Sequence, residues 1–528
     1  MEFDLTKLSS ISSATRAFVS ADESMVALAG QNHPYFSAES AIAAKQDFPA
    51  DARMRLSEHL QSQYRRLTDT SDTSEAVLAN IKALEKPDTY TVTTGQQLHL
   101  FLGPAFVLYK IMAIIRMTED LNLKHPDKHF VPVYWLASED HDIEEIRNTV
   151  VFGRNFRWNT DQSGACGRFH VREVAGLIDQ IKSELTLSES NITLLNAFEA
   201  IYNTSETLAD ATLRLVNHLF GQYGLICMDA DHAVFKSAVV PFIKKDILEK
   251  ANIEPFAEMS RQMEKNGFST QLSGRDINFF YLQTQQRNRI VYDNGVYQVQ
   301  NTDISFSPSE IAEDIERHPE RYSPNAMLRP LYQESILPNV AYIGGNAEVN
   351  YWLQITNVFK VNNINPPNLC LRPSVWIIPH KTGAWLQKSG IDPLKLLISA
   401  NTENLIVFLN PGTEVRNDLT TAFAKLKKEA QDIAAQSNSK ELHALVEAGK
   451  HYDKLLKSLD KHVIQTEKDK QQDKYQKLEE IYRIYFNIKE MQERKINALE
   501  LLIKHENVAF KLKNDCELQV GKGYLMTL

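Results

Sequence analysis

Four acid–base side chains stand in a row at Glu139, Asp140, His141 and Asp142, directly after Ser138. His141 could take a proton from an attacking amine, while the carboxylates could hold an ammonium group, orient the imidazole or bind Mg²⁺. A structural role is also open, because Ser138 could cap a helix whose positive end the acids complement. Four such groups exceed what capping needs, but the residues alone leave the catalytic and the structural role equally open.

Several other residues have the chemistry to bind a substrate. Lys110 could reach a phosphate or pair with an acid, and the planar fork of Arg372 suits carboxylate or phosphate. Gly344-Gly345 would let the backbone approach a ligand, although the pair would equally serve a tight turn. The predicted set for binding a substrate or nucleotide is Thr94, Gly95, Gln96, Gln97, Gly103, Lys110, Gly344, Gly345, Glu348, Tyr351, Arg372 and Ser374.

Two predicted strands lead into these polar stretches. Residues 90–94 form a strand-like run before Gly95-Gln96-Gln97, residues 106–115 carry apolar side chains at helical spacing, and residues 131–137 form a second apolar run before the acids. This order predicts a βαβ unit in a parallel sheet. Ligands of such sheets bind beyond the carboxyl ends of the strands, so both polar loops should share one edge.

Two further apolar runs, 224–230 and 339–343, predict additional core strands. We therefore expect an α/β fold, with a Rossmann-like parallel-sheet core over residues 1–410 and inserted pieces near 147–223 and 275–335. Asp293-Asn294-Gly295 predicts a hairpin inside the second insertion.

The C-terminal region has a different pattern. Beyond Pro411 there is no proline, and apolar residues recur every seven positions at Leu419, Leu426 and Ile433, and again from Leu478 to Leu502. We predict an antiparallel α-helical coiled coil over 411–510, with Gln492 and Lys495 as polar interruptions that set register, and a tail over 511–528. The exposed apolar rows of such a coil predict a homodimer.

The motifs also carry a resemblance to a known family. Thr94-Gly95-Gln96-Gln97, Gly103-Pro104, residues 138–142, residues 337–354 and Arg372-Pro373-Ser374 resemble, in the same order, the cysteine ligases of bacillithiol biosynthesis. Asn346 stands where that family is expected to have proline. The resemblance implies a dimeric enzyme that adds L-cysteine to the amine of glucosaminyl malate. It also favours the catalytic role, so we predict that Glu139, Asp140, His141 and Asp142 are catalytic.

Amide formation in water requires an activated carboxyl group, so the resemblance points to a nucleotide. Neither GxxxxGK[ST] nor GxGxxG is present. The layout is instead similar to class I aminoacyl-tRNA synthetases and related nucleotidyltransferases, without their HIGH and KMSKS signatures, and this likeness implies ATP. Two alternatives stay open at this point: a non-catalytic, nucleotide-responsive dimeric scaffold, and a nucleotidyltransferase that acts on another small metabolite.

Composition limits the partners. A formal net charge of -9 disfavours non-specific binding to nucleic acid or anionic membranes. The sequence has no apolar run near the roughly 18 residues of a membrane span. The four cysteines form no CxxC pair, which disfavours a disulfide framework and a cysteine-rich zinc site. We therefore expect a cytoplasmic enzyme with small-molecule substrates.

Overall fold

The computed structural model describes residues 1–30, 37–67, 74–185, 187–399, 405–409, 469–487, 491–517 and 521–528, with single residues between 425 and 458. The chain forms two compact units. The core unit comprises Glu2–Val375 and Glu493–Tyr524, and the second unit comprises Met1, Trp376–Gln492 and Leu525–Leu528. In sequence, the long segment Trp376–Gln492 of the second unit is thus inserted into the core unit between Val375 and Glu493.

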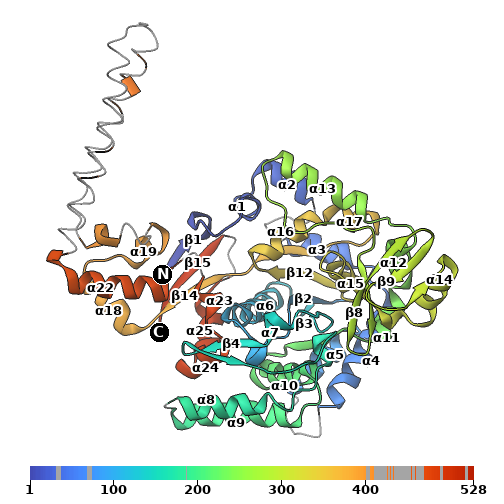
Figure 1. The fold of residues 1–528 in the computed structure, drawn as a ribbon, viewed down its shortest axis with the longest axis horizontal. Coiled ribbons are helices and arrows are strands. Elements are labelled where there is room, and N and C mark those ends of the chain that lie inside the picture. Colours follow the sequence, from blue (N-terminus) through green and yellow to red (C-terminus); the bar gives the residue numbers. More distant parts are fainter. Residues whose placement is uncertain are drawn as a thin grey trace. The chain divides into compact units, whose positions relative to one another are not determined.

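A five-stranded parallel sheet is the centre of the core unit (Figure 1). Its order is β13 (Asn368–Leu371), β12 (Asn339–Gly344), β2 (Thr89–Gln96), β3 (His129–Leu136) and β6 (Ile226–Asp229). Each neighbouring pair is parallel. The strands are buried along nearly their whole length, as expected for a parallel sheet covered on both faces. The predicted α/β, Rossmann-like core is therefore confirmed, and β13 is an edge strand that the sequence analysis did not predict.

The predicted βαβ unit is present as β2, α6 (Ala105–Lys124) and β3. Pro104 precedes the first helical residue, where its missing N–H costs nothing. Gly103 has φ of +83°, and a Cβ there would lie 2.5 Å from the Cβ of His99, so only glycine fits this turn. The turn places the start of α6 beside the end of β2.

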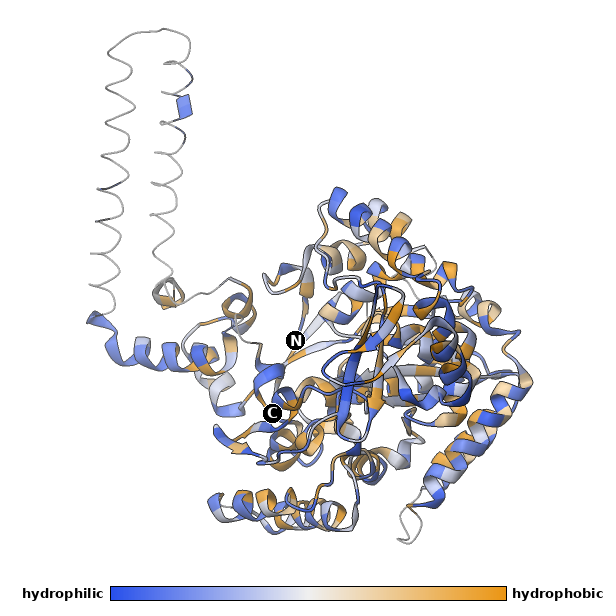
Figure 2. Cartoon of the chain, turned by 45° about the vertical axis from the view of Figure 1, so that its right-hand side comes forward, coloured by the Kyte–Doolittle hydropathy of each residue, from blue (hydrophilic) through white to orange (hydrophobic). Residues whose placement is uncertain are grey.

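Helices and small sheets surround the central sheet. Before β2 lie β1 (Glu2–Asp4), η1 (Leu5–Lys7), α1 (Ser13–Val19), α2 (Glu23–Ala29), α3 (Ala38–Lys45), α4 (Ala50–Arg65) and α5 (Glu75–Ala83). Between β3 and β6 lie α7 (Ile143–Ile146), β4 (Asn148–Val151), β5 (Arg154–Arg157), η3 (Cys166–Arg168), α8 (Ala175–Glu184), α9 (Glu189–Thr204), α10 (Leu208–Phe220) and η4 (Gly221–Tyr223). Figure 2 shows that apolar residues concentrate in the interior of the core unit, while its peripheral helices carry hydrophilic residues on their outer sides.

A second piece separates β6 from β12. It contains α11 (Ala233–Ala238), α12 (Val240–Ile247), α13 (Ile253–Lys265), β7 (Phe279–Gln283), β8 (Gln286–Asp293), β9 (Val296–Val299), β10 (Ser305–Phe306), α14 (Pro308–Arg317), η5 (Pro319–Arg321), β11 (Tyr322–Pro324) and α15 (Arg329–Ile336). The strands form an antiparallel sheet of order β10-β9-β8-β7-β11. The predicted hairpin joins β8 to β9, with positive φ at Asn294 and Gly295 as its turn requires.

The chain leaves the core unit after α16 (Asn346–Gln354), α17 (Thr356–Val361) and β13, and re-enters it at Glu493. The returning residues form α23 (Gln492–Lys495), α24 (Ala498–Lys504), α25 (Val508–Asp515) and β15 (Lys522–Thr527). Both α24 and α25 pack on α6, and β15 pairs antiparallel with β1, for example through Glu2 and Tyr524.

The second unit contains the end of β14 (Ser374–Ile378), α18 (His380–Lys388), α19 (Pro393–Ser399), η6 (Leu405–Phe408), α22 (Gln472–Ile481) and a π-helical turn, η8 (Tyr482–Phe486). Nearly all of the predicted coiled coil from 411 to 468 lies outside the described residues. The homodimer predicted from it stays a prediction. Among the described helices, none is both long and apolar enough to cross a membrane.

The prediction that the heptad rows from Leu478 to Leu502 lie on a single coiled-coil helix is wrong. The α-helix α22 ends at Ile481, and the described remainder of the rows is divided among η8, α23 and α24. Gln492 does not set a coiled-coil register, because its side chain pairs with the backbone N–H and carbonyl of Ile377 at 2.8 and 2.7 Å. The seven-residue spacing here arises from short helices that each bury apolar residues separately.

Candidate active site

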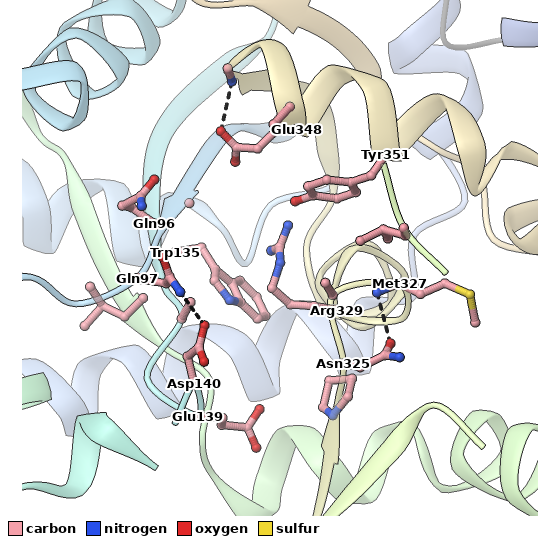
Figure 3. Close-up of a pocket in the computed structure, with 18 of the residues that line it drawn as sticks. Gln96, Gln97, Trp135, Glu139, Asp140, Asn325, Met327, Arg329, Glu348 and Tyr351 are labelled. Atoms are coloured by element: carbon pink, nitrogen blue, oxygen red, sulfur yellow. Dashed lines mark hydrogen bonds between the residues drawn. The ribbon is translucent and has the colours of Figure 1, made fainter. Parts of the chain in front are cut away.

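A cavity of about 610 Å³ opens at the carboxyl ends of β2, β3 and β12. This is the edge at which parallel α/β sheets bind ligands, and the volume is within the usual range for small-molecule sites. The predicted residues that line it are Gly95, Gln96, Gln97, Lys110, Glu139, Asp140, Gly345, Glu348, Tyr351 and Arg372. Two loops separated by some 40 residues in sequence thus meet at one site (Figure 3).

Lys110 is buried at one side of this cavity and forms an ion pair with Glu348. Its ammonium also donates to the carbonyl of Gly95 at 2.9 Å and to the side-chain oxygen of Gln96 at 3.0 Å. Burial alone would raise the pKa of Glu348, but Lys110 and the Gly345 N–H lower it below its ordinary value. The pair therefore stays charged and fixes the end of β2 to the start of α16.

The Gly344-Gly345 turn brings the backbone close to a cation. Glu348 reaches back to accept from the Gly345 N–H at 2.9 Å and from the Tyr342 hydroxyl at 2.6 Å. A Cβ at Gly345 would lie 3.4 Å from Nε of Arg372. The turn therefore serves as the strand-to-helix connection, and its close approach to a ligand stays a prediction.

Arg372 is buried and holds Glu493 through a bidentate ion pair of 2.8 and 2.5 Å. Within the described residues, its Nε has no hydrogen-bond partner. The guanidinium lies 5.4 Å from the centre of the Phe106 ring, which Lys110 and Arg494 approach to 5.7 and 5.9 Å. Three cations therefore surround one aromatic ring at the cavity.

Arg329, which the sequence analysis did not single out, adds a fourth cation. Its Nη1 donates to Gln333 at 2.9 Å and its guanidinium interacts with the Tyr351 hydroxyl, whereas Nη2 is buried without a hydrogen-bond partner in the described part of the chain. Figure 3 shows the guanidinium pointing into the cavity between Trp135 and Tyr351. We call Lys110, Arg329, Arg372 and Arg494 the cationic group. Arg329-Pro330 is a sequence signal for a helix start only, so nothing local identified Arg329 as a site residue.

The acidic loop, residues 138–142, lies across the cavity, and two of its carboxylates, those of Glu139 and Asp140, already have partners. Glu139 accepts from the buried ammonium of Lys236 at 2.5 Å. Burial raises the pKa of Glu139, and Lys236 only partly opposes that shift. Asp140 accepts from the side-chain amide of Gln97 at 2.6 Å and from the N–H of His141 at 2.7 Å. This last contact lies within the loop and caps no helix, because the N-cap of α7 is Asp142, which makes no capping hydrogen bond, and the Ser138 hydroxyl donates to Asp229 instead.

His141 lies beside the cavity rather than in its lining. Its Nδ1 is 2.8 Å from a guanidinium nitrogen of Arg287, so Nδ1 is the acceptor and the ring proton is on Nε2. Burial and then Arg287 lower the pKa of His141, which makes the imidazole neutral near pH 7. Arg287 itself lines the cavity, and it links His141 to the site indirectly.

The remaining predicted residues do not line the cavity, and Thr94 and Gly103 bond to other parts of the protein. Thr94 is buried and donates to the carbonyl of Ile343 at 2.7 Å. The carbonyl of Gly103 accepts from the N–H of Ala498 at 2.7 Å. Together with Asp142, Gly344 and Ser374, they are absent from the lining of the cavity.

The cationic group determines what the cavity can hold. Two guanidinium nitrogens without partners, Arg329 Nη2 and Arg372 Nε, fit an oxygen anion such as a carboxylate or a phosphate. Among the described residues, no three His, Cys, Asp or Glu side chains converge as a metal site would need. The site as described therefore favours an anionic ligand, and we assign no resident metal to it.

Comparison with known proteins agrees with the Rossmann-like fold. Residues 1–373 match the family model described as "Bacillithiol biosynthesis BshC, N-terminal Rossmann-like domain". The chain belongs to the BshC family. A protein of Flavobacterium psychrophilum named "Putative cysteine ligase BshC" is 36% identical over 463 residues, covering 86% of this chain and 85% of the relative.

Two further relatives carry the same name. One from Flavobacterium johnsoniae is 35% identical over 88% of both chains, and one from Bacillus cytotoxicus is 27% identical over 72% of both. The chain is thus a member of a family of ligases, as the sequence predicted. Glu493 and Arg494 lie outside the matched Rossmann-like domain.

Proposed function

We propose that this chain adds L-cysteine to the amine of glucosaminyl malate through an activated carboxyl group. The observation that carries the proposal is the arrangement of the cavity, in which guanidinium nitrogens without partners lie across from carboxylates. Cysteine is a zwitterion, and the malate half of the acceptor is a dicarboxylate. A cavity with one cationic and one acidic side suits both substrates.

The cationic group would bind the carboxylates, because charge-assisted hydrogen bonds to guanidinium are strong and directional. Glu139 is the best-placed proton acceptor for the attacking amine, since burial raises its pKa towards the range useful for a general base. Lys236 holds that carboxylate in place. In this account His141 acts through Arg287 and does not itself take the proton.

ATP is the activating group that we propose, and the cationic group would hold its phosphates. When bound, a nucleotide supplies the leaving group that makes amide formation favourable. The residues of this chain supply the remainder: they bind the two substrates, hold a carboxylate near the amine and pair the charges of the cavity. Any Mg²⁺ that accompanies the nucleotide also stays a proposal.

The test uses the purified full-length chain with cysteine, glucosaminyl malate and ATP. A ligase should form the joined product and release AMP or ADP only when both substrates are present, or show cysteine-dependent pyrophosphate exchange. Arg329→Ala should lose this activity. A matched control is Arg154→Ala, because Arg154 is an exposed arginine outside the cavity that pairs with Glu184. Nucleotide turnover without a need for cysteine would contradict the proposal.

A further inference from the structure

The residues on either side of the inserted second unit meet at the cavity. Arg372 lies four residues before Trp376, where the inserted segment of that unit begins, and Glu493 is the first residue after it. Although they are 121 residues apart in sequence, their side chains form the buried bidentate ion pair, with exposed fractions of 5% and 1%. The next residue, Arg494, lines the cavity itself.

The segment that returns to the core unit at Glu493 also fixes the start of α6. The Ala105 N–H donates to the carbonyl of Ile496 at 2.7 Å, and the Ala498 N–H donates to the carbonyl of Gly103 at 2.7 Å. Asn497 adds side-chain bonds to the Leu100 carbonyl and the Thr149 hydroxyl at 3.2 and 2.7 Å. Because α6 carries Phe106 and Lys110, residues 493–498 hold two residues that line the cavity.

We propose that residues 493–494 complete the substrate site from beyond the inserted unit: Glu493 positions Arg372, and Arg494 binds a dianionic group of the substrate. Glu493 occupies both terminal nitrogens of Arg372 and leaves Nε without a partner beside Gly345. The carboxylates paired within the cationic group are Glu348 and Glu493, two acids among four cations. The excess positive charge suits a dianion.

Two groups have this chemistry, namely the dicarboxylate of a malate-bearing acceptor and the phosphates of a nucleotide. The inference rests on the proposed function for the identity of the substrate, but the binding of an anion is measurable without turnover. A loss of binding in the variants below would therefore support the inference even if cysteine ligation were absent.

The experiment is calorimetric titration of the full-length chain with L-malate and, separately, with pyrophosphate. Arg494→Gln and Glu493→Gln should each weaken binding of one of these probes by about tenfold or more. The probe that is affected identifies the source of the dianion. Lys511→Gln is the matched control, because Lys511 is an exposed residue of the same returning segment and should bind as the wild type does.

A double-mutant cycle separates positioning from binding. If Glu493 acts through Arg372, the variant Glu493→Gln/Arg372→Gln should bind no more weakly than Arg372→Gln alone. Glu493→Asp should recover part of the affinity, and it also serves if Glu493→Gln fails to fold. Wild-type affinity for both probes in Arg494→Gln and Glu493→Gln, or no binding of either probe by the wild type, would overturn the inference.

Discussion

The two sides of the cavity differ in how their charges are satisfied. The acidic loop is contiguous in sequence, and three of its side chains are engaged: Glu139 by Lys236, Asp140 by Gln97, and His141 by Arg287. The cationic group is scattered over four segments, and two of its members keep guanidinium nitrogens without partners in the described structure. Most hydrogen-bonding groups of the acidic loop are thus already bonded within the protein. The cationic group, by contrast, has hydrogen-bonding capacity left for a ligand.

The largest expected effect is a loss of stability on removing Lys110, the cation that is paired with Glu348. Lys110→Met leaves Glu348 without its partner, and loss of one member of a buried ion pair costs about 3–5 kcal/mol. We expect the free energy of unfolding, measured by urea titration, to fall by about that amount. Lys110→Met/Glu348→Gln should recover part of the loss. Equal stability of Lys110→Met and wild type would show that this pair contributes nothing to the fold.

Arg329 should behave in the opposite way, with a large effect on activity and a small one on stability. Arg329→Ala removes a guanidinium that has hydrogen-bonding capacity left for a ligand, and losing a buried charged contact costs about 3 kcal/mol, or roughly a hundredfold in kcat/KM. Steady-state kinetics checks the activity, and the melting temperature checks the fold. Arg329→Lys should retain part of the activity, and an unfolded Arg329→Lys would mean that the residue is structural.

His141→Ala should have a smaller effect than Arg329→Ala. The imidazole lies outside the lining of the cavity and contacts Arg287, so its loss should lower kcat/KM by about tenfold or less. The same assay applied to Glu139→Gln gives the comparison, since that carboxylate lines the cavity. If His141→Ala were as inactive as Arg329→Ala, the imidazole would have to take part in the reaction directly.

The smallest expected effect is on the pH dependence of stability, through the protonation of His141. Its pKa in the folded chain is lowered from 6.5, first by burial and then by Arg287. The unfolded chain therefore binds a proton more readily, and stability is lost as pH falls from 6.5 towards the folded pKa. In Arg287→Gln, an NMR titration should show that pKa moving up towards 6.5. An unchanged pKa would exclude Arg287 as a cause.

The sequence predicted the parts of the fold that are encoded locally. Apolar runs of strand length identified β2, β3, β6 and β12, and helical spacing identified α6. It missed β13, whose four residues lie between Pro366-Pro367 and Arg372-Pro373. The heptad spacing from Leu478 was misleading, because short helices that pack one after another can reproduce a seven-residue period.

The candidate site shows the same limit. Gln97 and Asp140 could be placed together because both end neighbouring parallel strands, and their side chains do bond. Arg329 and Glu493 could not, because each acquires its role only from long-range packing. Glu493 pairs with a residue 121 positions away, across an inserted unit that gives no local signal of the contact.

The most direct test of the central claim, that the cationic group is where this ligase binds its substrates, is a mass-spectrometric measurement of low-molecular-weight thiols in a strain that lacks the gene. The wild-type chain and His141→Ala should restore bacillithiol, with a lower level in the variant. Arg329→Ala, expressed at the same level, should leave it far below the level that His141→Ala restores. Full restoration by Arg329→Ala would contradict the account.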